Sequence, residues 1–480
     1  MTQYLMRRTK IICTIGPATA SPERLDALIE AGMDVSRLNF SHGSHEFHGQ
    51  TIQQLRAISS QHRKPLALLQ DLCGPKIRLG KLPPDGIKVQ TGDEVTFVLN
   101  EEGNNPDEIP LPIPTLFAMV RVGEPISIND GRVKLIVTER DTDSIRALVK
   151  IGGLLSSKKG VNLPETYLPV TSVTEKDMTD LRFGLQSGID WVAVSFVRSA
   201  SDLEPVRRMI EAAGAKTRVI AKIEKREAVE NLEEILHTAD GIMIARGDLG
   251  VETPLDRVPL IQKEITRRCN QLGKPVITAT QMLESMINAP DPTRAEATDV
   301  ANSILDGTDA VMLSGETAVG EYPIAAVEMM NNIAIQTEKA LAEGLQTASE
   351  FPTCSISTTE SVAEAACHIA SQLGARGIMC NTSSGGSARL VSKYRPKTPI
   401  IAFTPEESTY RQLALSWGVQ PYLISPVHNA EQMLTNVVNA AVEMELAEYG
   451  DKVVITSGVP IGTPGTTSLI KVHKIGQAIA

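Results

Sequence analysis

Eight short apolar segments recur along this 480-residue chain, and each ends in glycine, proline or a polar residue. They occupy residues 10–17, 33–43, 66–76, 191–199, 218–225, 241–250, 275–283 and 310–318. Segments of this kind are typical of strands buried on both faces of a parallel sheet. Amphipathic segments such as 21–32 and 259–273 separate most of them and predict helices. The pattern therefore predicts an α/β fold built on a closed (β/α)8 barrel of the TIM type, with an open doubly wound sheet as the alternative.

The interval between the third and fourth apolar segments is far longer than the others. Within it, residues 92–100, 124–139 and 144–153 alternate apolar and polar side chains between turn signals, which is typical of β-strands. We therefore expect a small β-barrel domain at 77–170, inserted at the end of a barrel strand. Because barrel active sites lie at the carboxyl ends of the strands, this domain is placed to act as a lid.

The last part of the chain returns to alternating strands and helices. A boundary is expected near "SEFPTCSISTTES" at 349–361, and the pattern beyond it predicts an open α/β domain. The predicted domains are the barrel in two parts (1–76 and 171–345), the lid (77–170) and a C-terminal α/β effector-binding domain (346–480).

Charge and cysteine content exclude several kinds of protein. The formal net charge of −10 argues against a nucleic-acid partner or an anionic membrane surface, but it leaves room for a small anionic substrate. The six cysteines form no C-x-x-C pair, so neither a zinc site nor a dithiol redox motif is expected. We read no signal peptide and no apolar stretch long enough to cross a bilayer, which predicts a cytoplasmic protein.

Polar and ionisable residues follow most of the predicted barrel strands. They are Arg37, Asn39, Ser41 and His42; Asp71, Lys76 and Arg78; Lys222 and Glu224; Arg246, Gly247 and Asp248; Thr278, Thr280 and Gln281; and Ser314 and Glu316. Each alone could be a satisfied polar group at the rim, but so many at one barrel mouth favour an active site.

Two of these strand ends predict a metal site. Glu224 and Asp248 follow neighbouring strands, and carboxylate oxygens are the ligands that Mg²⁺ prefers. Lys222 lies two residues before Glu224 and so shares its face of the strand. With Arg37 across the mouth, Lys222 suits a phosphoryl group, whose transition state carries charge on its equatorial oxygens. A network of rim ion pairs is the structural alternative.

Several motifs then resemble the pyruvate kinase family. They are "RLNFSHG" (37–43), "GPKIR" (74–78), "SKKGVNLP" (157–164), "KIE" (222–224), "ARGDLG" (245–250), "ITATQMLESM" (277–286) and "PTRAEATDVANSILDGTDAVMLSGETA" (292–318). The resemblance runs over nearly the whole chain, and the segment 276–318 is highly specific. It implies magnesium-dependent transfer of phosphate from phosphoenolpyruvate to ADP, giving pyruvate and ATP. It also implies a homotetramer, with manganese as an alternative ion.

The resemblance assigns roles to residues by position. The implied catalytic residues are Lys222, Arg37, Thr280 and Lys76, and the metal ligands are Glu224 and Asp248. The substrate set is Arg37, Lys222, Gly247, Asp248, Thr280 and Ser195, in which Gly247 and Thr280 receive the substrate carboxylate. The nucleotide set is Asn39, Phe40, Ser41, His42, Arg78 and Lys159. A solvated lysine pair is the alternative for Lys158 and Lys159, and the proton donor stays open between a water and the Thr280 hydroxyl.

The chain departs from potassium-dependent members of that family at two positions. Those members carry Thr directly after the Asp and Glu at the position of Lys76, whereas this chain has Leu72 and Lys76. A potassium site at Asn39, Ser41 and Asp71 would therefore be incomplete. We expect the Lys76 ammonium to supply the missing charge, so that K⁺ is not required; a surface lysine without a catalytic role is the alternative.

The segment "NTSSGGSARL" (381–390) resembles the family's effector-phosphate loop. Thr382, Ser383, Ser384 and Ser387 are the implied ligands, because hydroxyls and backbone N–H groups at a helix N-terminus suit a phosphate. Gly386 replaces a longer side chain, and the last loop (458–468) lacks the Trp and Arg of members that respond to fructose 1,6-bisphosphate. A sugar monophosphate or AMP is the expected activator, and a plain helix cap is the alternative.

Two other functions were weighed against this one. A magnesium-dependent aldolase acting on phosphoenolpyruvate or pyruvate would use the carboxylates and Arg37, but neither the lid lysine nor the effector domain. A non-catalytic sugar-phosphate sensor would show damage at Lys222, Glu224 or Asp248, and all three are intact.

Overall fold

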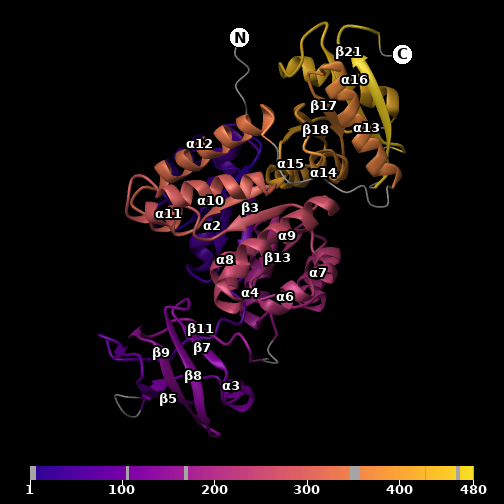
Figure 1. Cartoon of the computed structure of the whole chain (residues 1–480). Coiled ribbons are helices and arrows are strands. Elements are labelled where there is room, and N and C mark those ends of the chain that lie inside the picture. Colours follow the sequence, from indigo (N-terminus) through magenta and orange to yellow (C-terminus); the bar gives the residue numbers. More distant parts are fainter. Residues whose placement is uncertain are drawn as a thin grey trace.

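A computed structural model describes residues 7–103, 108–166, 171–345, 357–427, 429–460 and 465–478. The chain forms three domains in a row, with the lid at one end of the barrel and the C-terminal domain at the other (Figure 1). The predicted boundary at 346 lies in 346–356, outside the described residues, as do residues 167–170 at the predicted end of the lid and 461–464 of the last loop.

Eight parallel strands close into a barrel, which confirms the barrel over the open sheet. Around the ring they are β1 (Lys10–Ile15), β16 (Ala310–Leu313), β15 (Val276–Ala279), β14 (Gly241–Ala245), β13 (Arg218–Ile223), β12 (Trp191–Val194), β3 (Ala67–Asp71) and β2 (Val35–Asn39). β1 pairs with both β2 and β16, so the first and last strands close the ring. All eight carboxyl ends therefore meet at one mouth.

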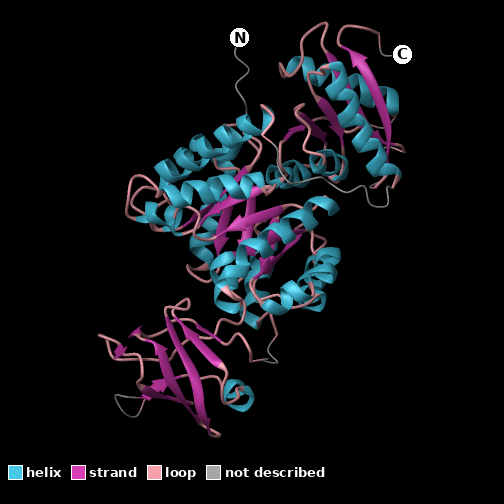
Figure 2. Cartoon of the chain, in the orientation of Figure 1, coloured by secondary structure: helices cyan, strands magenta, loops and turns pink. Residues whose placement is uncertain are grey.

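Helices surround the strands, as the amphipathic segments predicted (Figure 2). They are α1 (Pro22–Ala31), α2 (His45–Gln61), α4 (Glu175–Gln186), α5 (Glu204–Ala212), α6 (Arg226–Glu230), α7 (Leu232–Thr238), α8 (Arg246–Glu252), α9 (Val258–Leu272), α10 (Arg294–Leu305), α11 (Gly315–Ala318) and α12 (Pro323–Ala342). Side-chain caps start several of them: Ser21, Ser44, Thr174 and Thr293 each accept a backbone N–H of the first turn.

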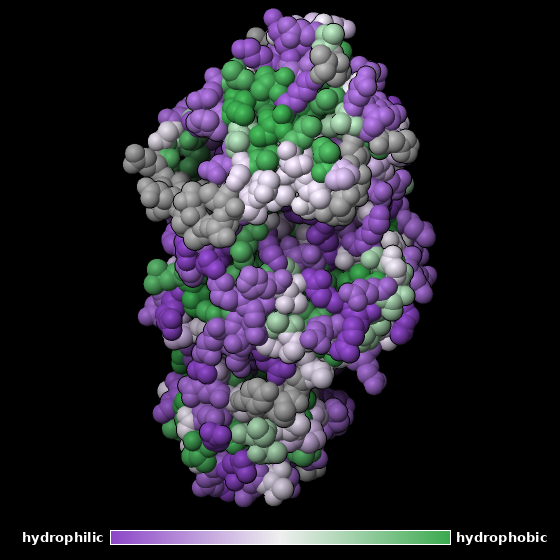
Figure 3. All heavy atoms as spheres, turned by 90° about the vertical axis from the view of Figure 1, so that its right-hand side faces the viewer, coloured by the Kyte–Doolittle hydropathy of each residue, from purple (hydrophilic) through white to green (hydrophobic). Residues whose placement is uncertain are grey.

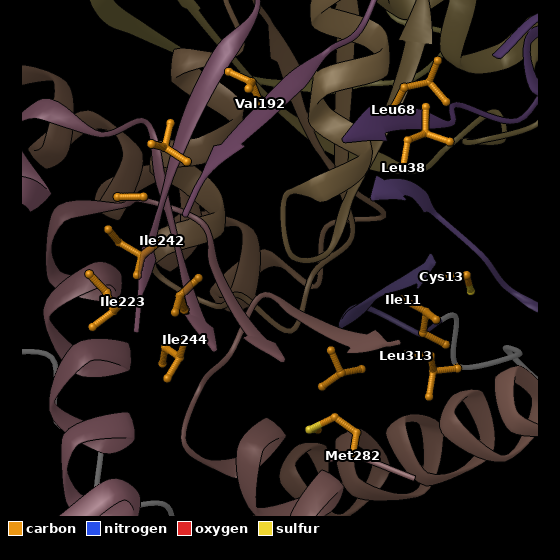
Figure 4. Packing of buried hydrophobic residues seen from close by; sticks show 14 of the residues in the cluster. Ile11, Cys13, Leu38, Leu68, Val192, Ile223, Ile242, Ile244, Met282 and Leu313 are labelled. Carbon is orange, nitrogen blue, oxygen red and sulfur yellow. The ribbon is translucent and has the colours of Figure 1, made fainter. Parts of the chain in front are cut away.

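The strands bury side chains on both faces. Outward-pointing residues such as Leu38, Leu68, Val192 and Ile242 pack against the helices in one large core (Figure 4). Inward-pointing residues such as Ile12 form a second core inside the ring. This two-sided burial is why the strands lack an alternating pattern in the sequence.

The inserted domain is built from strands, as predicted. Six of them form a sheet in the order β11 (Val161–Asn162), β7 (Pro125–Ile128), β8 (Val133–Arg140), β9 (Ser144–Ile151), β5 (Glu94–Val98) and β6 (Glu108–Pro110). The pair β10 (Gly153–Leu155) and β4 (Ile87–Val89) and the helix α3 (Pro114–Met119) complete it. Its core, around Phe97 and Leu135, is separate from the barrel core. Within the described residues its strands form two sheets and not one closed ring.

The C-terminal domain has a five-stranded sheet in the order β19 (Val419–Leu423), β18 (Ile400–Thr404), β17 (Ile378–Asn381), β20 (Lys452–Gly458) and β21 (Thr467–Lys474), of which β21 alone is antiparallel. Its helices are α13 (Thr358–Leu373), α14 (Gly386–Lys393), α15 (Glu407–Gln412) and α16 (Ala430–Glu443). A large hydrophobic area lies on the face of this domain seen in Figure 3. Among the described residues no helix has the length and apolar character needed to cross a membrane.

The C-terminal domain is docked on the amino end of the barrel. Ala414 and Leu415, directly after α15, belong to the same core as Ile12 and Trp191 inside the barrel. Arg411 of α15 donates to the buried Asp190 carboxylate at 2.9 Å. The domain thus seals the end of the barrel opposite the mouth.

A buried ion pair at the amino end of the barrel yields a stability prediction. Asp34 accepts hydrogen bonds from the Arg7 guanidinium and the Ile11 N–H, both at 2.8 Å. Burial alone would raise the pKa of Asp34, but Arg7, Lys10 and Lys64 outweigh it and hold that pKa below its usual value. We expect Asp34→Asn to lower the thermal midpoint at pH 7 by roughly 5–10 °C, because it leaves buried cations uncompensated.

The sign of the pH dependence follows from the lowered pKa. The stabilisation is complete above the unfolded-state pKa of about 3.9 and is lost as the pH falls through the lower folded-state value. Differential scanning calorimetry at pH 7, 5 and 3 should show that the difference in thermal midpoint between variant and wild type is smallest at pH 3. The exposed Asp85→Asn is the control, and an equal difference at all three pH values would contradict the assignment.

Candidate active site

Lys222 is the centre of a buried charge cluster at the mouth of the barrel. Its ammonium lies 3.1 Å from Asp71 Oδ1 and 2.9 Å from Glu224 Oε1, and it donates to Ser195 Oγ at 2.7 Å. Burial alone would lower the pKa of Lys222, but the two carboxylates outweigh it and raise that pKa above its ordinary value. Lys222 is therefore a permanent buried cation, fixed in direction by three acceptors from three strand ends.

Arg37 completes this cluster from β2. Its Nε donates to Asp71 Oδ2 at 2.7 Å and its Nη1 donates to Thr14 Oγ1 at 3.0 Å. The buried Asp71 carboxylate thus lies between two cations, which outweigh its burial and lower its pKa. The sequence identified Arg37 and Lys222, but not that Asp71 aligns both of them.

The charges of Glu224 and Asp248, the two predicted metal ligands, repel each other. Burial first, and then the charge of Asp248, raise the pKa of Glu224, while Lys222 and the Phe196 N–H oppose the rise. Glu224 Oε2 accepts that N–H at 2.8 Å. Asp248 is half-buried in the first turn of α8 and forms no hydrogen bond with the other described residues. Two repelling carboxylates with free lone pairs are the donor set that Mg²⁺ fits.

Thr280 and Gly247 lie side by side after β15 and β14, and Gly247 directly precedes Asp248. The Gly247 N–H donates to Thr280 Oγ1 at 2.7 Å. Thr280 and Gln281 both have left-handed backbones, with φ of 67° and 53°. That conformation is costly for a β-branched residue and clusters at functional sites. Arg246 holds the turn by donating to the Thr280 carbonyl at 2.8 Å, a role that the sequence did not reveal.

The predicted nucleotide residues divide into two groups. Asn39 to His42 follow β2; Asn39 Oδ1 accepts the Ser41 N–H at 3.1 Å, and His42 is exposed. The Phe40 side chain is buried and stacks on His48 at 4.1 Å, while its backbone N–H donates to the Asp71 carbonyl at 3.0 Å and its carbonyl accepts from Lys176 Nζ at 2.9 Å, so the predicted nucleotide role of Phe40 gains no support. Arg78 and Lys159 belong to the lid connection, where Arg78 donates to the Lys158 carbonyl at 2.9 Å and Lys159 is exposed.

Lys76 lies where β3 leads into the lid. Its Cε would be 3.1 Å, and its Nζ 3.9 Å, from a Cβ built on Gly160. No hydrogen bond or ion pair of its ammonium occurs among the described residues. The Leu72 side chain is buried in the barrel core and has no oxygen, while its carbonyl accepts the Ser195 hydroxyl at 2.7 Å.

Some predicted strand-end residues are structural. The buried Glu316 accepts the N–H groups of Leu283 and Ser314, at 3.1 and 2.7 Å. Thr278 is fully buried and donates to Thr308 Oγ1 at 3.0 Å. These two residues are therefore hydrogen-bonded polar groups at the rim of the barrel, which was the structural alternative.

The four predicted effector residues line one cavity of about 240 Å³ in the C-terminal domain. Thr382 Oγ1 accepts the Gly385 N–H at 3.0 Å, and the Ser387 and Thr467 hydroxyls are 2.6 Å apart. Ser383 and Ser384 complete this wall of the cavity. Residues 461–464 of the last loop lie outside the described residues.

Two arginines lie behind this loop. Arg389 of α14 and Arg218 of β13 both donate to the Ser384 carbonyl, at 2.8 and 2.9 Å. Burial, and then the charge of Arg218, lower the pKa of Arg389 to about 9. The sequence did not reveal the Arg218 contact, because it depends on how the two domains dock, whereas Arg389 is only five residues from Ser384.

The mouth of the barrel therefore offers two fixed cations, a carboxylate pair for a divalent ion and a polar notch at Gly247 and Thr280. This set can hold an anion that carries both a phosphoryl group and a carboxylate, and can stabilise negative charge on the phosphoryl oxygens in flight.

Comparisons with known proteins agree with this chemistry. The family model "Pyruvate kinase, barrel domain" matches residues 6–327, and "Pyruvate kinase, alpha/beta domain" matches 360–473. The chain is 46% identical to a pyruvate kinase of Geobacillus stearothermophilus and 45% identical to one of Staphylococcus aureus. Each alignment covers 99% of this chain and 82% of the relative.

A solved structure is similar over almost its whole length. The crystal structure of a pyruvate kinase from Cryptosporidium parvum is 36% identical to this chain and superposes with a TM-score of 0.89. The match covers 98% of this chain and 96% of that one.

Proposed function

We propose a reaction path for this chain, which belongs to the pyruvate kinase family and is a phosphotransferase. In this path a terminal oxygen of ADP attacks the phosphorus of phosphoenolpyruvate. The bond from phosphorus to the enol oxygen breaks, and the enolate takes a proton at its terminal carbon to give pyruvate. The observation that supports it most is the cluster of Lys222, Arg37, Asp71 and Glu224 at the mouth of the barrel.

Each group in the mouth has a task in this path. Lys222 and Arg37 hold the phosphoryl oxygens, and Asp71 and Ser195 keep the two cations aimed at one point. Gly247 N–H and Thr280 Oγ1, now bonded to each other, would turn to the substrate carboxylate. Thr280 is then close to the carbon that takes the proton, which comes from its hydroxyl or from a water beside it.

Glu224 and Asp248 would hold the magnesium ion. The ion would supply positive charge against the negative charge of the phosphoryl group. Asn39, Ser41 and His42 would contact the nucleotide from the barrel, and Arg78 and Lys159 from the lid.

The central test is Lys222→Met. We expect wild type to form pyruvate from phosphoenolpyruvate and ADP in a coupled assay with magnesium. The variant should lose about 10³-fold or more in kcat, because the missing charge acts chiefly in the transition state. Its KM for ADP should change little.

The same variant needs a fold control. Loss of the ammonium leaves Asp71 and Glu224 without their shared cation, so we expect a lower thermal midpoint but an unchanged circular dichroism spectrum at 20 °C. A folded Lys222→Met protein with wild-type kcat would rule out this role.

We also propose that turnover does not require potassium. Asp71 already lies between Arg37 and Lys222, Asn39 Oδ1 already accepts a backbone N–H, and the Leu72 side chain has no oxygen to offer. Lys76 has no partner among the described residues and is near the mouth, so its charge is available to the substrate.

The measurement for this proposal is the rate with K⁺ exchanged for tetramethylammonium at constant ionic strength. The wild-type rate should stay within about twofold, whereas Lys76→Glu with Leu72→Thr should become dependent on K⁺, because the cation then replaces a lost ammonium. A many-fold rise of the wild-type rate on adding K⁺ would exclude the proposal.

Finally, we propose that a sugar monophosphate or AMP activates the enzyme from the cavity lined by Thr382, Ser383, Ser384 and Ser387. The support is the wall of hydroxyls and the positive charge of Arg218 and Arg389 directly behind it. Arg218 is also the first residue of β13, the strand that carries Lys222.

Ser383→Asp tests this assignment. Its charge should repel a phosphate, so glucose 6-phosphate, ribose 5-phosphate and AMP should no longer lower the half-saturating phosphoenolpyruvate concentration. The rate at saturating substrate should not change. Ser371→Asp, on the exposed end of α13, is the control, and activation that survives Ser383→Asp would place the effector elsewhere.

A further inference from the structure

The carboxylate of Glu252 joins three elements that surround the mouth. Glu252 is the last residue of α8, the helix whose first turn carries Gly247 and Asp248. Its Oε1 accepts a hydrogen bond from Asn162 Nδ2 of the lid strand β11 at 2.8 Å. The same oxygen accepts one from Lys225 Nζ at 3.0 Å, and Lys225 directly follows Glu224. One atom therefore connects the lid with both elements that carry the proposed metal ligands.

This contact is well placed to set the position of the lid. The Glu252 side chain is 2% exposed, so water does not compete for its oxygens. Asn162 lies three residues after Lys159 in the same segment of the lid. Because this connection is so short, Lys159 cannot move far from Asp248 while Asn162 is bonded to Glu252.

A second contact lies beside the first. The lid turn at Asn129, Asp130 and Gly131 has three successive left-handed residues, with φ of 55°, 55° and 79°. A Cβ built on Gly131 would be 3.5 Å from Val251, the neighbour of Glu252 in α8. The lid thus meets the end of α8 at two points. A cavity of about 60 Å³, lined by Lys76, Phe196, Asn162 and Lys225 among others, adjoins the bond and leaves room for the lid to shift.

We propose that Glu252 is a positioning residue: its bond to Asn162 is a latch that holds the lid, and with it Lys159, over the nucleotide. The proposal rests on the proposed function. The proposal predicts different effects on the binding of the two substrates. The phosphoenolpyruvate contacts at Arg37, Lys222 and Thr280 all lie on the barrel, whereas part of the ADP site lies on the lid.

The sharpest test is Asn162→Asp, which keeps the shape of the side chain and turns a donor into a second carboxylate facing Glu252. We expect KM for ADP to rise about tenfold, the size expected for one lost hydrogen bond to a charged group, while KM for phosphoenolpyruvate stays within about twofold. Adding Glu252→Gln should restore much of the ADP affinity, since the amide of glutamine can donate to the new carboxylate.

Thr166→Val is the matched control. Thr166 Oγ1 donates to Glu124 Oε2 at 2.6 Å, a bond to a carboxylate that stays inside the lid. This variant should lower the thermal midpoint about as much as Asn162→Asp does, but leave both KM values unchanged.

The outcomes separate the latch from its premise. A KM for ADP that Asn162→Asp leaves unchanged, or a rise in both KM values together, would overturn the latch. So would failure of Glu252→Gln to rescue the Asn162→Asp variant. If wild type itself forms no pyruvate from phosphoenolpyruvate and ADP, the proposed function fails instead.

Discussion

Closure of the parallel barrel is the constraint on which the rest of the structure depends. β1 pairs with β2 on one side and with β16 on the other, so residues 300 positions apart become neighbours. A strand buried on both faces can expose polar side chains only at its ends. All polar chemistry of the barrel is therefore confined to its two rims, with the charge cluster at the carboxyl rim and the docked C-terminal domain at the other.

The charge cluster is stable because its members compensate one another. Lys222 and Arg37 bring two positive charges, and Asp71 and Glu224 bring two negative charges. Removing any one of these charges would leave a buried ion without a partner, which is costly. Asp248 stands outside this balance, and its charge raises the pKa of Glu224. The negative charge left over is what a divalent cation neutralises.

The sequence predicted the barrel and the residues at its mouth because strand order and strand ends are local features. Apolar runs identify the strands, and the polar residue that follows each run must lie at the rim. Contacts between distant elements leave no such signal. The bonds of Arg218 to Ser384, and of Glu252 to Asn162, join residues that no spacing relates. The same limit applies to Glu316. Its position at a strand end is the same as that of the active-site carboxylates, but it accepts two backbone N–H groups and is therefore structural.

The two appended domains are attached by different physical means, and this difference corresponds to their proposed roles. The C-terminal domain inserts Ala414 and Leu415 into the barrel's inner core and adds the buried Asp190 to Arg411 pair. Moving it would expose apolar surface and separate buried charges. The lid has its own core and meets α8 through the Asn162 to Glu252 bond and the contact at Gly131. Breaking these two contacts would expose no apolar core shared with the barrel. The domain proposed as a lid is therefore held at two points, while the domain with the proposed effector cavity shares an apolar core and a buried ion pair with the barrel.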